Sequence, residues 1–173
     1  IMKINQIKKE FPIFKKKINN KPLVYLDSAN SSQKPNTVIN RMSYFYENEF
    51  SNVGRSVHSL AVTATNRFEE TRDLVKNFIN AKHREEIIFT KGATEGINLV
   101  ANSYGDKFVN EGDEIILTEL EHHSNYVPWH YLRNRKKAVI KFAKINENLE
   151  IEVDEIKKLI TNKTKMIAIT HIS

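Results

Sequence analysis

The run GATEG at residues 92–96 is the first group of residues that could carry chemistry. It lies between an expected strand at 87–90 and an expected helix from residue 97. Gly92 permits close backbone approach, and Thr94 is a suitable helix cap whose hydroxyl could also donate to an anion. The first N–H groups of a helix attract anions as well. The run therefore permits a phosphate-binding turn, although the local sequence alone favours an ordinary strand-to-helix turn.

The motif is neither of two common phosphate-binding patterns. No Gly-Lys-Ser/Thr follows it, which excludes a P-loop, and the pattern GxGxxG of dinucleotide-binding turns is absent.

A second candidate group reads EHHSN at residues 121–125, after an expected strand at 114–118. Residues that follow a strand in an α/β sheet lie at the edge where ligands bind. His122 or His123 could exchange protons, bind a metal or stack on a flat ring. Adjacent histidines on an extended chain point to opposite faces, which argues against a shared metal ion. Alternatively, one histidine caps the next helix and the other is solvated.

The elements that must position these groups alternate between helix and strand. Apolar residues at helical spacing predict helices at 35–46 and 61–79, the latter with one apolar stripe: Ala61, Ala64, Phe68, Val75, Phe78 and Ile79. Further strands are expected at 138–144 and 165–170, and further helices at 97–104, 126–135 and 153–160. Short β-branched runs separated by helices predict an α/β fold with a parallel sheet buried on both faces.

Composition narrows the class of protein. The 173 residues are 40% hydrophobic and 28% charged, which suits a soluble globular chain. No apolar run approaches the roughly 18 residues of a membrane span. The chain has no cysteine, which excludes disulfides and a cysteine nucleophile within it. Residues 1–22 carry seven lysines and one acid, which accounts for the whole net charge of +6. We therefore expect a local basic surface and neither a nucleic-acid nor a membrane partner.

Taken in order, five segments resemble the group II (SufS-type) cysteine desulfurases. GATEG is shared by many class V aminotransferase-fold enzymes, whereas the HHSNYVPW run and the DSA…SQKP opening are typical of group II. The resemblance covers essentially the whole chain. The segments are Phe11–Ile13, Lys21–Ala29 with Ser32–Pro35, Gly92–Ala101, Glu121–Trp129 and Ile169–Ser173.

This resemblance implies a pyridoxal-5′-phosphate-dependent transferase of fold type I (aspartate-aminotransferase-like). Residues 1–60 would form an N-terminal helical and loop segment bordering the active site. Residues 61–173 would form the first part of the large cofactor-binding α/β domain, truncated before its end. The implied activity converts L-cysteine to L-alanine and passes the sulfur as a persulfide to a SUF-type acceptor for iron–sulfur cluster assembly. The resemblance also implies a homodimer when the enzyme is complete. The expected compartment is the cytoplasm or, in a eukaryote, a plastid-type organelle.

The resemblance also assigns site residues. Ala93 and Thr94 would bind the cofactor phosphate, and His122 would stack on the pyridine ring and assist proton transfers. Ala29 and Asn30 would lie on the substrate side, and no metal is expected. The Schiff-base lysine and the nucleophilic cysteine of the family lie beyond Ser173, so we expect these 173 residues alone to be inactive.

Two other interpretations stay open. The chain could belong to another class V enzyme, such as a selenocysteine lyase or an epimerase. It could also be a truncated, non-catalytic chain that serves as an interaction module.

Overall fold

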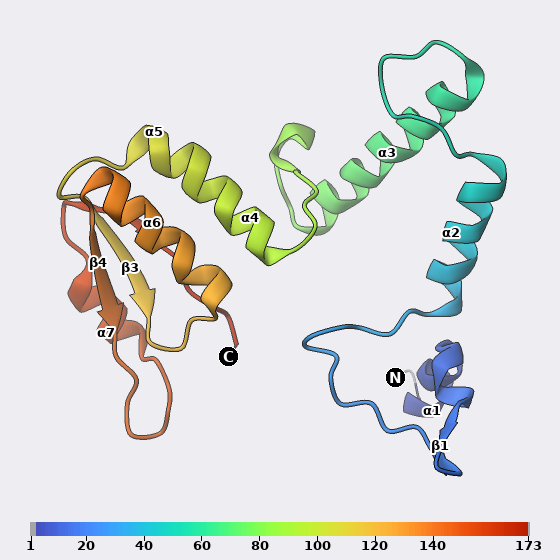
Figure 1. Ribbon diagram of the computed structural model, residues 1–173, viewed down its shortest axis with the longest axis horizontal. Coiled ribbons are helices and arrows are strands. Elements are labelled where there is room, and N and C mark those ends of the chain that lie inside the picture. The colour runs from blue at the N-terminus through green and yellow to red at the C-terminus, as the bar shows by residue number, and fades with distance from the viewer. Residues whose placement is uncertain (1–2, 173) are drawn as a thin grey trace. The chain divides into compact units, whose positions relative to one another are not determined.

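The computed structural model in Figure 1 describes residues 3–172. Contacts within the chain divide it into two compact units, residues 1–87 and 88–173. The predicted boundary at residue 60 concerns the parts of a complete enzyme, which this division does not test, so it stays a prediction. Of the helices described, none is both long and apolar enough to cross a membrane.

The first unit consists of helices and one small hairpin. The hairpin turns at Asn19 and Asn20, which have positive φ angles of 50° and 61° and so match the twist of its strands. Its elements are α1 (Ile4–Lys9), the 3-10 helix η1 (Pro12–Lys15), β1 (Lys17–Ile18), β2 (Lys21–Pro22), α2 (Asn36–Asn48), α3 (Ser59–Phe78) and the 3-10 helix η2 (Arg84–Glu86).

Helices α2 and α3 confirm the two helices predicted from apolar spacing, but their apolar residues are mostly exposed. Only Ala61 and Ala64 of the expected α3 stripe are buried, and Phe78 is 90% exposed. No residue of α2 is buried. The strands described in this unit are the two-residue strands of the hairpin, which offer no broad surface on which a helix could pack.

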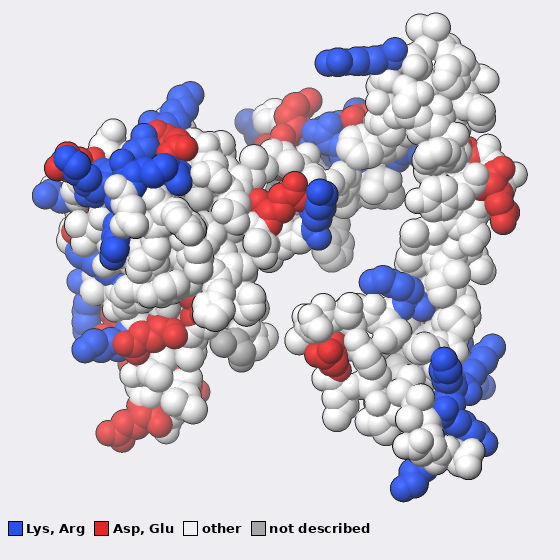
Figure 2. Space-filling model, viewed as in Figure 1, with Lys and Arg blue, Asp and Glu red and all other residues white. Residues whose placement is uncertain are grey.

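The basic N-terminus lies at the surface. All seven lysines between residues 3 and 22 are exposed, and Figure 2 shows blue side chains gathered over the N-terminal elements. The charge surplus is therefore a solvated surface feature of the first unit.

The second unit is built on a three-stranded parallel sheet in the order β4-β3-β5. This confirms the α/β class and the parallel direction. Its elements are α4 (Ala93–Val100), the π-helix η3 (Ala101–Gly105), α5 (Asp106–Phe108), β3 (Glu114–Thr118), the 3-10 helix η4 (His123–Asn125), α6 (Val127–Lys136), β4 (Val139–Ala143), α7 (Val153–Leu159) and β5 (Thr164–Ile167).

Two expected strands differ from the structure. Residues 87–90 do not form a strand, since they pair with none of the described strands. Strand β5 ends at Ile167 instead of residue 170. The backbone N–H of Thr170 donates to the Glu121 carboxylate, at 3.0 Å, and so takes no part in the sheet.

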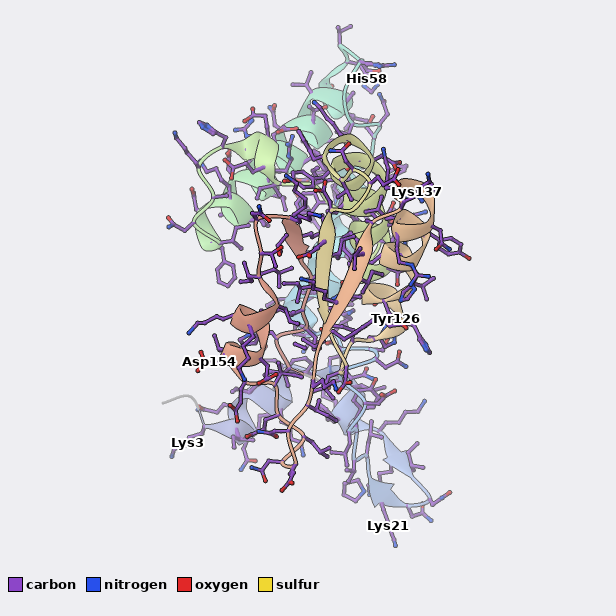
Figure 3. All side chains as sticks on the ribbon, turned by 90° about the vertical axis from the view of Figure 1, so that its left-hand side faces the viewer. Lys3, Lys21, His58, Tyr126, Lys137 and Asp154 are labelled. Atoms are coloured by element: carbon purple, nitrogen blue, oxygen red, sulfur yellow. The ribbon has the colours of Figure 1, made fainter. Side chains whose placement is uncertain are left out.

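The core of this unit lies between the sheet and α6. Ile115 and Leu117 of β3 pack with Trp129 and Leu132 of α6, all four buried. Helix α7 lies on the other side of the sheet, where it contacts β4. Figure 3 shows Tyr126, at the start of α6, and Asp154 of α7 on opposite sides of the strands. Burial on both faces holds for β3, whose residues are all buried, but β4 and β5 are partly exposed.

Helices α4, η3 and α5 follow one another without a break, and the π-helix η3 contacts α6. A Cβ at Gly105 would lie 2.6 Å from Leu132 Cδ2, so a side chain there would force Leu132 to move. Since the π-helix lies against α6, the packing at Gly105 fixes where α4, and thus its N-terminus, lies relative to the sheet.

Candidate functional site

The sequence-predicted groups meet at the carboxyl edge of the sheet in the second unit. Strand β3 ends at Thr118, and the loop that follows carries His122 and leads into η4. Helix α4 contacts η4, so the GATEG helix and the histidine loop are neighbours. Ala93 and Thr94 begin α4 and His122 caps η4, so the three residues belong to two elements that are in contact.

The start of α4 presents unused backbone donors. The first helical bond runs from Gly96 N–H to Gly92 O, at 3.1 Å, so the N–H groups of Ala93 and Thr94 have no acceptor within the helix. Both residues are exposed, and a Cβ at Gly92 would meet no atom within 4 Å. The turn therefore has room and donors for an anion.

Thr94 does not cap the helix, contrary to expectation. The helix begins at Ala93 with Gly92 as its N-cap, so Thr94 is the second helical residue. Within residues 3–172 the Thr94 hydroxyl has no hydrogen-bond partner, which leaves it as a further donor. The Glu95 carboxylate accepts from Lys91 N–H, at 2.5 Å, outside the helix. The donors at the helix start suit a phosphate group.

His122 is held by the helix that follows it. Its Nδ1 accepts a hydrogen bond from Ser124 N–H, at 3.1 Å, and lies 2.9 Å from Ser124 Oγ. The capping role left open from the sequence is thus confirmed for His122. Because a backbone N–H can only donate, Nδ1 must carry a lone pair, and the proton of the neutral ring is on Nε2. The ring is exposed, which leaves Nε2 and one ring face for a ligand.

Glu121 joins three segments beside this histidine. One carboxylate oxygen accepts from Thr118 Oγ1, at 2.6 Å, and from Thr170 N–H, at 3.0 Å. The other accepts from Asn125 Nδ2, at 2.7 Å. Sequence reasoning did not identify Glu121, although an acid directly before the histidine pair was visible.

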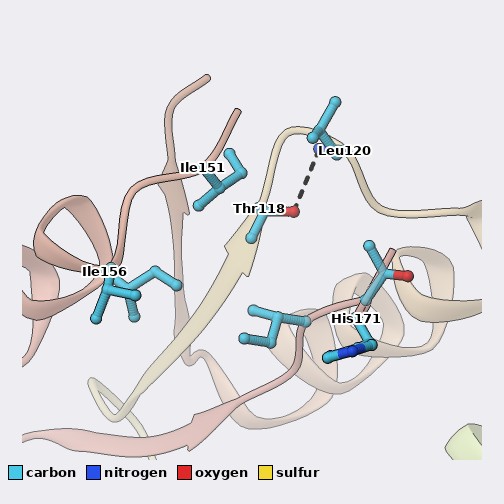
Figure 4. A pocket seen from close by; sticks show the side chains of 8 residues that line it. Thr118, Leu120, Ile151, Ile156 and His171 are labelled. Carbon is cyan, nitrogen blue, oxygen red and sulfur yellow. Dashed lines mark hydrogen bonds between the residues drawn. The ribbon is translucent and has the colours of Figure 1, made fainter. Parts of the chain in front are cut away.

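A cavity of about 390 Å³ adjoins this edge on the α7 side, with Thr118 and Thr170 among its lining residues (Figure 4). The lining is otherwise mainly aliphatic, from Leu120, Ile151, Val153, Ile156 and Ile169. None of the predicted cofactor residues lines it.

Ala29 and Asn30 belong to the first unit. They lie in an exposed turn, in which Asn30 Nδ2 donates to the Asp27 carboxylate, at 3.3 Å. Their assignment to the substrate side stays a prediction.

Comparison with known proteins agrees with the motifs. The sequence profile of the class-V aminotransferases matches residues 24–173. Proteins called "Probable cysteine desulfurase" from Staphylococcus aureus and Staphylococcus epidermidis are 51% and 49% identical over 170 residues, or 98% of this chain. The chain spans about 41% of the length of these relatives.

Two solved structures extend the likeness to three dimensions. The apo structure of a cysteine desulfurase from Thermococcus onnurineus superimposes with a TM-score of 0.88 at 32% identity, over 100% of this chain and 41% of that one. The cysteine desulfurase CsdA from Escherichia coli, in an S-sulfonic acid form, gives 0.77 at 33% identity, over 96% of this chain and 41% of that one.

Proposed function

Because the chain belongs to the class-V aminotransferase family, we propose that it is the N-terminal part of a pyridoxal-5′-phosphate-dependent cysteine desulfurase. The complete enzyme would convert L-cysteine to L-alanine and pass the sulfur as a persulfide to a SUF-type acceptor for iron–sulfur cluster assembly. The names of the staphylococcal and archaeal relatives support this substrate.

Within this chain, the α4 start and the histidine loop would hold the cofactor. The N–H groups of Ala93 and Thr94 and the Thr94 hydroxyl would bind its phosphate, a dianion that suits a helix N-terminus. His122 would lie against the cofactor ring, with its proton on Nε2 as the Ser124 contact requires. When bound, pyridoxal phosphate supplies an electron sink for the amino acid. The observation that supports the proposal is the contact of α4 with η4. It puts the helix that begins at Ala93 beside the 3-10 helix that His122 caps.

His122 would also move protons in the complete enzyme. Its Nε2 is the nitrogen left free by the Ser124 cap, so proton transfer to or from a substrate would occur there. Ala29 and Asn30 would border the substrate, and a lysine and a cysteine outside this chain would complete the site.

We further propose that the complete enzyme is a homodimer. Large apolar side chains of α2 are exposed, among them Met42, Tyr44 and Tyr46, and a subunit interface is a suitable cover for them.

Alanine and sulfide production from L-cysteine by the complete purified enzyme tests the proposed function. We expect alanine in the presence of pyridoxal phosphate and a reductant, and none from these 173 residues alone. If selenocysteine but not cysteine is turned over, the enzyme is a lyase of different specificity. Absence of both activities in a cofactor-loaded complete enzyme would contradict the proposal.

A further inference from the structure

We propose that Glu121 is a positioning residue, which holds the loop carrying His122 onto the carboxyl edge of the sheet. The proposal rests on the proposed function and goes beyond it, because Glu121 would act through hydrogen bonds to its neighbours and not on the cofactor itself.

The donors to Glu121 come from three places in the chain. Thr118 is the last residue of β3, Thr170 follows β5, and Asn125 ends η4. Their bonds to the carboxylate are 2.6, 3.0 and 2.7 Å long. His122 lies between Glu121 and η4, so its backbone is fixed on both sides by the same set of bonds.

Both oxygens of the Glu121 carboxylate must act as hydrogen-bond acceptors for these bonds to form. The Thr170 N–H can only donate, so the first oxygen must accept. The Asn125 amide is oriented by Trp129, whose indole N–H donates to Asn125 Oδ1 at 2.9 Å. The Asn125 NH₂ group therefore faces Glu121, and the second oxygen must accept as well.

A glutamine at position 121 cannot meet both demands. Its oxygen would have to accept from Thr170, which would leave its NH₂ group facing the NH₂ group of Asn125. Rotation of the Asn125 amide would relieve that clash but would break the bond to Trp129, which is 2% exposed. An unsatisfied polar group of this kind is costly in a partly buried site.

The same logic gives a rescue variant. In Glu121→Gln/Asn125→Asp, the glutamine NH₂ group would donate to one oxygen of the introduced aspartate. The other oxygen of that aspartate would accept from Trp129, and Thr118 and Thr170 would donate to the glutamine oxygen. All four hydrogen bonds are thereby restored. Only the bond between positions 121 and 125 changes direction, because position 121 now donates and position 125, which carries the negative charge, accepts.

The readouts report the loop and the site separately. Trp129 is the single tryptophan of this chain. In an enzyme whose remaining part has no tryptophan, its fluorescence therefore reports changes in the hydrogen bonds around Asn125. The visible absorbance of bound pyridoxal phosphate and its pH dependence follow the surroundings of His122. The kcat for alanine formation measures the effect on catalysis.

The experiment compares the complete enzyme with four variants. Glu121→Gln should shift the cofactor absorbance and lower kcat about tenfold or more, because a small displacement of a positioned group is costly to rate. Glu121→Gln/Asn125→Asp should recover most of both. The matched control Glu119→Gln should resemble the wild type. Among residues 3–172 the exposed Glu119 carboxylate accepts only from Ile145 N–H, at 3.1 Å, and a glutamine can do the same.

The fourth variant, Thr118→Val, removes one donor to Glu121 and should change kcat in the same direction by a smaller factor. It decides the matter if Glu121→Gln does not fold; wild-type absorbance and kcat in Thr118→Val would then overturn the proposal.

Wild-type absorbance and kcat in a folded Glu121→Gln would overturn the proposal. A defect in Glu121→Gln that the double variant does not recover would also overturn it, because hydrogen-bond direction would then not be the cause. A wild-type enzyme that neither binds the cofactor nor forms alanine would refute the proposed function instead.

Discussion

At each edge of the sheet, one glutamate accepts hydrogen bonds from other segments of the chain, but the donor groups at the two edges differ. At the amino edge, Glu114 accepts from Lys141 Nζ, at 2.8 Å, and from the hydroxyls of Thr161 and Thr164, at 2.7 and 3.2 Å. At the carboxyl edge, Glu121 accepts from a hydroxyl, an amide and a backbone N–H. Of these two glutamates, only Glu114 forms an ion pair with a described residue.

This difference indicates which edge stabilises the fold and which edge is open to a ligand. The hydrogen bond from Lys141, helped by that from Thr161, holds the pKa of Glu114 below its usual value against the opposing effect of burial. Its carboxylate is satisfied by partners on β4 and beside β5, and only 8% of the residue is exposed. The carboxyl edge instead presents exposed His122 and the open start of α4. The amino edge holds the strands together, and the carboxyl edge is where we propose that the cofactor binds.

Removing the histidine ring should have the largest effect. His122→Ala in the complete enzyme should lower kcat about a hundredfold, the lower range for loss of an acid–base group. The melting temperature should hardly change, because the exposed ring loses only its bond from Ser124. Steady-state alanine formation and a thermal melt measure the two effects. An unchanged kcat and cofactor spectrum would remove His122 from the site.

Removing the cation at the amino edge should have the opposite pattern. Lys141→Met leaves the nearly buried Glu114 carboxylate without its charged partner and should lower the melting temperature by about 4–8 °C. Once the variant is folded, its kcat should stay within about twofold of the wild type. Scanning calorimetry and the alanine assay test this. A large fall in kcat without a loss of stability would show that the two edges are not separate in role.

The smallest expected effect is in the acid sensitivity of folding. Because the folded-state pKa of Glu114 is lowered, its stabilising contribution is present above its ordinary pKa near 4.5 and is lost as pH falls through the folded value. Glu114→Gln should therefore be less stable than the wild type at pH 7, and the gap should narrow at pH 3. Urea midpoints at the two pH values measure it, with Glu119→Gln as the control. A gap that does not narrow would contradict the role given to Lys141.

The sequence alone was sufficient for elements that are defined by local pattern. Strand β3 was predicted with its observed bounds, because β-branched residues bounded by turns are a strong local signal. Residues 87–90 carry a similar signal and yet form no strand, since a strand needs a partner that the local sequence cannot supply. The helix α3 was predicted correctly, but the exposure of most of its apolar stripe could not be, because periodicity predicts an apolar face and not what covers it.

In the candidate site too, residues in short local motifs could be predicted, whereas contacts between distant segments could not. The phosphate turn and His122 were visible as short motifs, and the structure places them in neighbouring elements. The role of Glu121 was not visible, because one of its donors, Thr170, lies 49 residues away in the sequence. The sequence also could not show that Gly92 and not Thr94 is the N-cap of α4, since both residue types are suitable N-caps.

The affinity of the complete protein for pyridoxal phosphate, measured by absorbance titration, tests the central claim most directly when one variant at each edge is compared. Thr94→Val removes a hydroxyl donor to a charged group and should raise the dissociation constant about tenfold or more. Lys141→Met, at the other edge, should leave it unchanged. If both variants weaken binding equally, or if neither does, the carboxyl edge of this sheet is not the cofactor site.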